Sequence, residues 1–216
     1  TLAPYQKLTC PVLSRFLSSS FPDSLLSTQE CMQVSEAAYH CGSNVSASDW
    51  LHVALQRNDF KKAIDKKHYL YYRAKLNYAL GNYNASVTWF TRYKKAFGET
   101  PSVVLYLARA YRRLGKSSAA SRMYDRHLRL YPKHPNSHDI LWYRAWQHEE
   151  EGDFNRAISL FRSMYRRHPG SRQAAKARFR CGLLYYRQKN YDSAYHIWES
   201  YARSYSSSYH APRSEE

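Results

Sequence analysis

Apolar residues recur along most of the chain at the spacing of one face of an α-helix, and they do so in a phrase that repeats. The phrase is clearest in GDFNRAISLF (152–161), where a Gly-Asp turn comes before a run with helical spacing. It occurs again as GNYNASVTWF (81–90) and, without its glycine, as KNYDSAYHIW (189–198). The pattern predicts a turn followed by an amphipathic helix, used several times.

Aligned on their turns, the copies have a regular period. Gly81, Gly115, Gly152 and Lys189 lie 34, 37 and 37 residues apart, and a period near 34 with two helices is typical of the tetratricopeptide repeat. Small residues stand seven positions before and five positions after each turn, where we expect helix crossings, with a large aromatic residue nine positions after it. These residues are Ala74, Ala108, Ala145 and Gly182; Ser86, Ala120, Ala157 and Ala194; and Phe90, Tyr124, Phe161 and Trp198.

The repeats predict an all-α fold, a right-handed superhelix (solenoid) of tetratricopeptide-like helix pairs. About four repeats fill residues 67–216, and we interpret residues 49–66 as a degenerate helical hairpin because Asn58, Phe60 and Ala63 imitate the turn phrase. Residues 1–48 are Ser-rich and form a helical N-terminal cap in this prediction. The capping-box spacing of STQE (27–30) predicts a helix over 28–41.

Charge is unevenly distributed along the chain. The net charge is +16, yet residues 1–60 sum to −2, so residues 61–216 carry +18. A basic surface indicates an anionic partner such as nucleic acid, anionic lipid or an acidic cell-wall polymer; a merely solvated surface is the alternative. The sequence contains no run of about 18 apolar residues, so it predicts no transmembrane segment. The N-terminus has no signal-peptide pattern, so a signal was either never there or has been removed.

The four cysteines are few and widely spaced. Cys10, Cys31, Cys41 and Cys181 form no CxxC motif, so the sequence predicts no zinc site and no redox motif. The three that precede residue 42 are compatible with one disulfide in an oxidising compartment, and equally with reduced, buried thiols. We expect no cofactor and no metal.

The last two repeats resemble a known family. Residues 141–205 are similar to the helical solenoid that precedes the catalytic domain of soluble lytic murein transglycosylases, through Arg144-Ala145-Trp146, Gly152-Asp153-Phe154 and ARFRCG (177–182). The resemblance implies a periplasmic, peptidoglycan-associated scaffold, with a catalytic domain after residue 216. The family's catalytic Glu-Ser pair and its GLMQ-like stretch do not occur in this chain, so we expect no enzymatic activity from the chain itself.

In tetratricopeptide repeats the first helix of each pair lines the inner surface. Aromatic faces stack on sugar rings, and arginine pairs with carboxylates or phosphates, so such a groove suits a glycan bearing acidic peptides or an extended acidic protein segment. Ordinary packing between repeats is the alternative. The candidate groove residues are Tyr71, Lys75, Arg109, Arg112, Arg113, Trp146, Tyr186 and Arg187. Leu105, Glu149 and Glu150 occupy related positions, and Arg113, Glu150 and Arg187 predict an Arg–Glu–Arg ladder.

Two other motifs carry little chemistry. HEEEGD (148–153) lies where a helix is predicted to end, with no apolar pocket to raise a glutamate pKa. HPNSH (134–138) places two histidines four residues apart, but Pro135 keeps them off a helix, so a loop is the better interpretation than a metal site. The sequence therefore favours a non-catalytic scaffold of a lytic transglycosylase. The alternative is a free-standing adaptor that binds an acidic protein segment, and nucleic-acid binding is unlikely because only the net charge suggests it.

Overall fold

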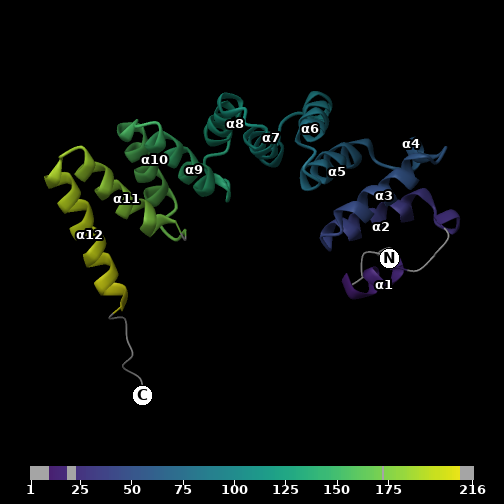
Figure 1. Cartoon of the computed structure of the whole chain (residues 1–216), viewed down its shortest axis with the longest axis horizontal. Helices are drawn as coiled ribbons and strands as arrows, with labels where there is room; N and C mark the ends of the chain where they lie inside the picture. Colours follow the sequence, from purple (N-terminus) through teal and green to yellow (C-terminus); the bar gives the residue numbers. More distant parts are fainter. Residues whose placement is uncertain (1–9, 19–22, 172, 210–216) are drawn as a thin grey trace, which may run out of the picture. The chain divides into compact units, whose positions relative to one another are not determined.

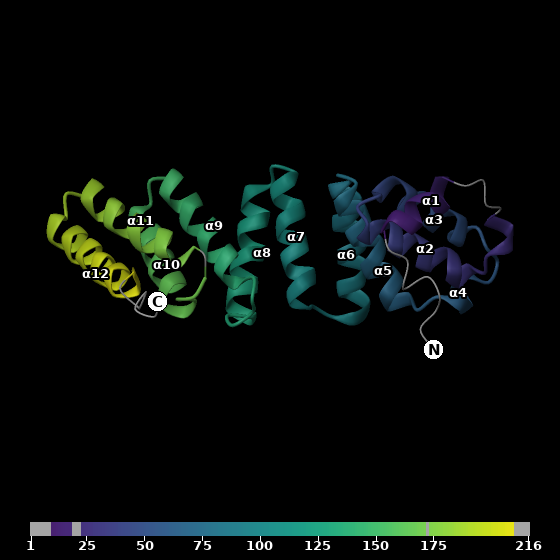
Figure 2. The same cartoon turned by 90° about the horizontal axis from the view of Figure 1, so that it is seen from below.

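The computed structural model describes residues 10–18, 23–171 and 173–209, and every regular element in these ranges is a helix. The chain forms two compact units, Thr1–Met123 and Tyr124–Glu216, which we call the N-terminal and C-terminal units. The fold is an all-α solenoid of tetratricopeptide-like helix pairs, as the repeats predict (Figures 1 and 2). Among the helices described, none combines the length and the apolarity needed to cross a membrane.

Residues 66–209 form four consecutive helix pairs. Each pair consists of a first helix, a tight turn and a second helix, at the places where the sequence pattern puts them (Figure 1). The pairs are α5 (Lys66–Ala79) and α6 (Tyr83–Phe97), α7 (Pro101–Arg113) and α8 (Ser117–Leu130), α9 (Ser137–Glu150) and α10 (Phe154–Arg167), and α11 (Ala174–Arg187) and α12 (Tyr191–Tyr209).

The turns within the pairs share one backbone conformation. Gly81, Gly115 and Gly152 have φ angles of 80°, 71° and 78°, in the left-handed region that ends many helices. Lys189 takes the same place with φ 62°, although a side chain makes that conformation costly. In each turn the amide of the third residue after the helix donates to a carbonyl in the last turn of that helix, as from Asn82 N to Asn77 O at 2.9 Å. The missing glycine at 189 therefore changes the sequence of the turn without changing its shape.

A fifth pair of the same kind precedes the four. It consists of α2 (Thr28–His40) and α3 (Asn44–Leu55), joined by Gly42 with φ 81° and closed by a 2.9 Å bond from Ser43 N to Ala38 O. Ser35, Ala47 and Leu51 stand seven before, five after and nine after this glycine, and all three are buried. Ser35 Oγ donates to Ala47 O at 2.6 Å, much as Ser86 Oγ donates to Ala74 O at 2.9 Å in the next pair.

This pair spans residues 28–55, so it does not coincide with the predicted segments 1–48 and 49–66. Helix α3 begins at Asn44 and runs through the predicted boundary, and Phe60–Ala63 forms only the single turn α4. The repeat pattern does not reveal this pair in the sequence because Leu51 stands where the later repeats have an aromatic residue, whereas Phe60 and Ala63 imitate the expected spacing. The predicted start of α2 is confirmed: Ser27 and Glu30 form the capping box.

Small residues lie at the helix crossings, as predicted. Ala74, Ala108, Ala145 and Ala157 are all 0% exposed. Ala74 belongs to the same apolar cluster as Phe90, and Ala145 and Ala157 belong to the same cluster as Phe161. Gly182 has a specific reason to be smaller than alanine. A Cβ added there would lie 2.2 Å from Nε1 of Trp198, the largest aromatic residue in the series.

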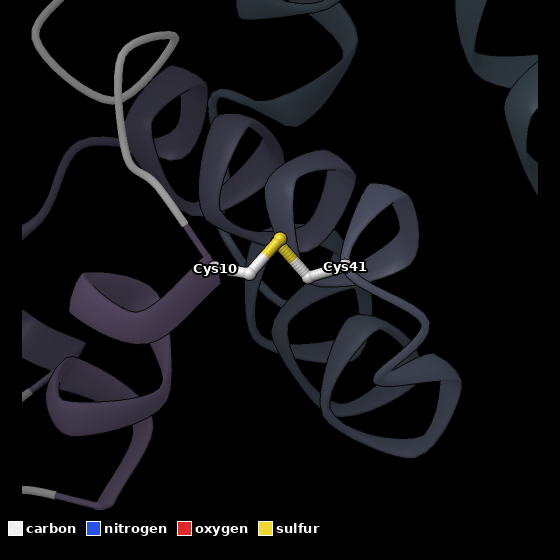
Figure 3. Close-up of a disulfide and its surroundings, with 2 residues drawn as sticks. All are labelled: Cys10 and Cys41. Carbon is white, nitrogen blue, oxygen red and sulfur yellow. A yellow bond between two sulfur atoms is a disulfide. The ribbon is translucent and has the colours of Figure 1, made fainter.

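A disulfide ties the first helix of the structure to the fifth pair. Cys10, at the start of α1 (Cys10–Ser18), is bonded to Cys41 directly after α2, with 5.4 Å between the Cα atoms (Figure 3). Leu13 of α1 is buried in the same apolar cluster as residues of α2 and α3. Cys31 and Cys181 are buried and belong to no disulfide among the described residues. Of the two arrangements that the cysteine positions left open, the structure contains the disulfide.

Candidate functional site

In the N-terminal unit the first helices of three successive pairs bring tyrosines and cations together. The Lys75 Nζ atom of α5 lies 4.9 Å from the centre of the Tyr39 ring of α2 and 5.7 Å from that of Tyr71. The Tyr39 hydroxyl is hydrogen-bonded to that of Tyr106 on α7. With Arg109, one helical turn after Tyr106, these residues form what we call the tyrosine–cation face: Tyr39, Tyr71, Lys75, Tyr106 and Arg109.

The tyrosine–cation face is a packed arrangement of rings rather than a loose surface. The Tyr106 ring stacks on Phe90 at 5.2 Å and meets the edge of Tyr78 at 5.5 Å. Burial raises the pKa of Tyr106 to about 12, against the lowering effect of Arg109, so its hydroxyl stays protonated at neutral pH. Aromatic packing of this kind fixes side chains at little entropic cost on binding. Lys75 is therefore held in place by rings on two helices.

The segment that supplies four of the five residues of the tyrosine–cation face is strongly basic. Residues 66–123 contain twelve lysines and arginines and one acidic residue, Glu99, which pairs with Lys94. Within the part of the chain that the structure describes, Lys75, Arg109 and Arg113 form no salt bridge with a carboxylate. Among the described residues, therefore, no carboxylate is paired with any of these three cations.

The predicted groove residues of the N-terminal unit have different environments. Arg112 and Arg113 are exposed in the last turn of α7, and their spacing from Arg109 places all three on one side of the helix. Tyr71 is half-buried against Phe90 and Tyr93, so it supports the face by packing. Leu105 was expected on the surface but is 3% exposed, which makes it a core residue.

Sequence reasoning missed Tyr39 and Tyr106. Tyr39 stands three residues before Gly42, as Tyr78 stands three before Gly81, so it occupies a predicted groove position of the fifth pair. Recognising Gly42 as a repeat turn would have found it. Tyr106 follows Leu105, the residue that the sequence pattern places in the groove. Only the packing of α7 shows that Tyr106 is half-buried and Leu105 is in the core.

In the C-terminal unit the first helices α9 and α11 meet through an ion pair. Both Glu149 carboxylate oxygens lie 2.7 Å from Arg180 Nη1, and Glu149 Oε1 lies 3.7 Å from Arg187 Nη1. The Arg180 guanidinium lies 5.5 Å from the centre of the Trp146 ring. The Glu149 side chain is only 7% exposed, so its charge is neutralised by two arginines.

The predicted ladder through Glu150 is therefore wrong. Glu150 is exposed and belongs to no ion pair among the described residues, whereas Glu149 faces α11. One residue along a helix turns the side chain by about 100°, which is enough to move it off the contact face. Trp146 and Tyr186, two of the predicted groove residues, are 42% and 53% exposed.

The remaining motifs take part in local contacts. In HEEEGD the Glu151 carboxylate lies 3.3 Å from Nδ1 of His148, at the end of α9. In HPNSH the Nδ1 atom of His134 accepts a hydrogen bond from the Asn136 amide at 3.3 Å, within the loop before α9. The described residues contain no group of three side chains able to hold a metal ion.

Comparison with known proteins agrees with the repeat pattern. The family model for the tetratricopeptide repeat matches residues 105–172 and 148–209. No curated protein matches the sequence. The transglycosylase resemblance finds no support in these comparisons.

Solved structures show the same fold at low sequence identity. The MamA protein is 15% identical with a TM-score of 0.65, covering 88% of this chain and 97% of its own. A tetratricopeptide repeat protein from Parabacteroides merdae is 18% identical with a TM-score of 0.61, covering 82% and 66%. YrrB, described as a TPR protein with an unusual peptide-binding site, is 14% identical with a TM-score of 0.56, covering 89% and 92%. By its turns, its crossings and these likenesses, the chain carries tetratricopeptide repeats and has the fold of a tetratricopeptide solenoid.

Proposed function

We propose that the chain is a tetratricopeptide adaptor, and that its tyrosine–cation face binds an extended acidic segment of a partner protein. The observation that carries the proposal is a set of three cations beside packed tyrosine rings, Lys75, Arg109 and Arg113, which have no carboxylate partner among the described residues. The peptide-binding site of YrrB, a protein of similar fold, also supports a peptide as the ligand. Binding rather than catalysis is the expected activity.

The placement of the cations indicates the kind of segment. Lys75 on α5 and Arg109 on α7 occupy equivalent positions of successive first helices, and such stacked helices lie on the order of 10 Å apart. In a polyproline II segment, residues i and i+3 point to the same side and are separated by about 9 Å. We therefore expect a partner segment with acidic residues three apart, so that one carboxylate reaches Lys75 and the next reaches Arg109.

Fluorescence anisotropy with labelled peptides tests the proposal. The probe is a Gly/Ser peptide with Glu at every third position, and its matched control has Gln at those positions. At about 0.1 M salt, where charges more than about 10 Å apart are screened, we expect the acidic peptide to bind at least tenfold more tightly. Equal affinity for the two peptides would contradict the proposal.

Matched substitutions locate the site. Lys75→Ala, Arg109→Ala and Arg113→Ala together remove three charges from the face, and each exposed pair contributes up to about 1 kcal/mol, so affinity should fall about tenfold to a hundredfold. The control variant removes three exposed charges from other places in the same unit. Its substitutions are Lys95→Ala, Lys116→Ala and Arg122→Ala. An equal loss in both variants would mean that the net charge, and not this face, binds the peptide.

Two further assays test peptidoglycan and nucleic acid as alternative ligands. Co-sedimentation with purified sacculi measures the first, and a salt titration with a DNA oligonucleotide measures the second, because phosphate binding weakens steeply with salt. If the chain binds sacculi but not the acidic peptide, and the triple variant of the face no longer binds sacculi, then the ligand of the face is the glycan and not a protein segment.

We also propose that the chain works in an oxidising compartment such as the periplasm. Disulfides persist in such compartments and are rare in the cytosol, and Cys10–Cys41 is the supporting observation. Alkylation of thiols in intact cells, followed by mass spectrometry, should find Cys10 and Cys41 protected and linked. Both cysteines alkylated before reduction would contradict this location.

A further inference from the structure

A second basic site lies in the C-terminal unit, on the second helix α10 beside the first helix α11. A surface depression of about 510 Å³ is lined by the second helix α10 and by Tyr185 of α11. Three arginines, two serines and an asparagine contribute its polar groups, and Ile158 with the Tyr185 ring contributes apolar surface. The polar residues are Asn155, Ser159, Arg162, Ser163, Arg166 and Arg167.

Helix geometry gathers the polar groups into one stripe. Arg162 and Arg166 are four residues apart, and so are Ser159 and Ser163, so their side chains are neighbours on the helix surface. Gln188 Nε2 donates to Asn155 Oδ1 at 2.9 Å, which joins α10 to the end of α11 beside the depression. The stripe and the Tyr185 wall therefore belong to two packed helices rather than to a loop.

The arginines of the depression have no acidic partner in the part of the chain that the structure describes. None of Arg162, Arg166 and Arg167 forms a salt bridge within residues 10–18, 23–171 and 173–209. Arg166 and Arg167 lie in the last turn of α10, where cations interact favourably with the helix dipole. Arg162 lies more than a turn earlier and is half-buried, so the dipole does not account for it. Like charges four apart repel each other, and a bound anion would remove that repulsion.

We propose that this depression binds a phosphate monoester. The guanidinium groups of Arg162, Arg166 and Arg167 hold the phosphate through paired N–H donors, and the hydroxyls of Ser159 and Ser163 donate to its remaining oxygens. The organic group of the ester lies against Ile158 and Tyr185. A phosphate monoester fits better than a carboxylate because three cations and two hydroxyls converge on one place, and a monoester dianion offers three acceptor oxygens.

Isothermal titration calorimetry on the full chain tests the proposal with phenyl phosphate, inorganic phosphate and phenol at constant ionic strength. We expect one phenyl phosphate per chain, bound at least fivefold more tightly than inorganic phosphate because the ring adds contact with Tyr185, and no binding of phenol. A neutral peptide containing phosphotyrosine is a separate arm: tighter binding than phenyl phosphate identifies a protein segment as the source of the ester, and weaker binding identifies a small molecule.

Charge-matched variants make the test specific. Arg162→Gln with Arg166→Gln should lower the affinity for phenyl phosphate at least tenfold, whereas Arg129→Gln with Lys176→Gln, which removes two exposed charges of the same unit outside the depression, should leave it unchanged. Melting curves check that each variant is folded: phosphate should raise the melting temperature of the control and not that of the Arg162/Arg166 variant. Absence of binding at millimolar phenyl phosphate, or equal losses in the two variants, would overturn the proposal.

Discussion

Gly182 and Trp198 form a size-matched pair that can be tested by exchange. In the first and third of the four predicted repeats the equivalent pairs are Ala74 with Phe90 and Ala145 with Phe161. An alanine Cβ at position 182 would lie 2.2 Å from Nε1 and 2.6 Å from Cδ1 and Cε2 of Trp198. Gly182→Ala alone should therefore push the indole away and break its 3.2 Å hydrogen bond to Phe179 O.

The expected cost follows from opposing effects. Replacing a helical glycine by alanine stabilises by about 0.5–1 kcal/mol, but overpacking costs about 1–3 kcal/mol and the lost hydrogen bond about 1 kcal/mol. The net loss for Gly182→Ala should be about 1–3 kcal/mol. Trp198→Phe alone should also destabilise, because it removes buried ring atoms and leaves a void.

The double variant Gly182→Ala/Trp198→Phe recreates the alanine–phenylalanine pair of the other repeats. Its free energy of unfolding should return to within about 1 kcal/mol of the original chain, which means a coupling energy of at least about 1 kcal/mol between the two sites. Urea unfolding followed by circular dichroism at 222 nm measures all four proteins. Additive losses in the double variant would refute the size-matching argument.

Three further predictions concern the turns, the disulfide and the effect of pH. Lys189→Gly should stabilise the chain by about 0.5–1 kcal/mol, because removing about 1–2 kcal/mol of left-handed strain at φ 62° outweighs the entropic cost of glycine, about 0.5–1 kcal/mol; thermal melting measures it, and a lower melting temperature would contradict it. Replacing Cys10 and Cys41 by serine removes a cross-link of sequence separation 31, which the chain-entropy model values at about 3–4 kcal/mol; urea unfolding should show that loss and no change in native helix content. Burial raises the pKa values of Cys181 and Tyr106 to about 12, above their values in an unfolded chain. Their contribution to stability is therefore complete at neutral pH and is lost as pH rises from about 9 towards 12, so the urea midpoint should fall over that window, and a flat profile would be inconsistent with burial of these groups.

The sequence predicts the fold well wherever the repeat phrase is complete. Backbone conformation and packing both depend on residue size at fixed offsets, so Gly81 or Ala145 can be recognised without coordinates. The sequence pattern does not reveal the fifth pair, α2 and α3, because the aliphatic Leu51 takes the core position that an aromatic residue has in the later repeats. Lys189 shows the opposite case, in which the surrounding pattern was strong enough to reveal a turn without glycine.

The candidate sites could be predicted only in part. The positions of Lys75 and Arg109 in the repeat are enough to predict them. The sequence does not show whether Glu149 or Glu150 contacts α11, because successive helix residues point about 100° apart and the predicted helix bounds do not fix the orientation of α9 that closely. The sequence does not predict the depression around Arg162, because arginines on the second helix of a pair are expected on a solvated surface. Its shape comes from the packing of α10 on α11.

Charge reversal tests the proposed binding face most directly. The variant Lys75→Glu/Arg109→Glu keeps the tyrosine rings and reverses the charge at the two positions that should meet acidic residues three apart. Anisotropy with paired peptides, one with Glu and one with Lys at every third position, measures the preference of each protein. The account predicts that the original chain prefers the Glu peptide and that the variant prefers the Lys peptide. A variant that still prefers the Glu peptide, while remaining folded by circular dichroism, would contradict binding at the tyrosine–cation face.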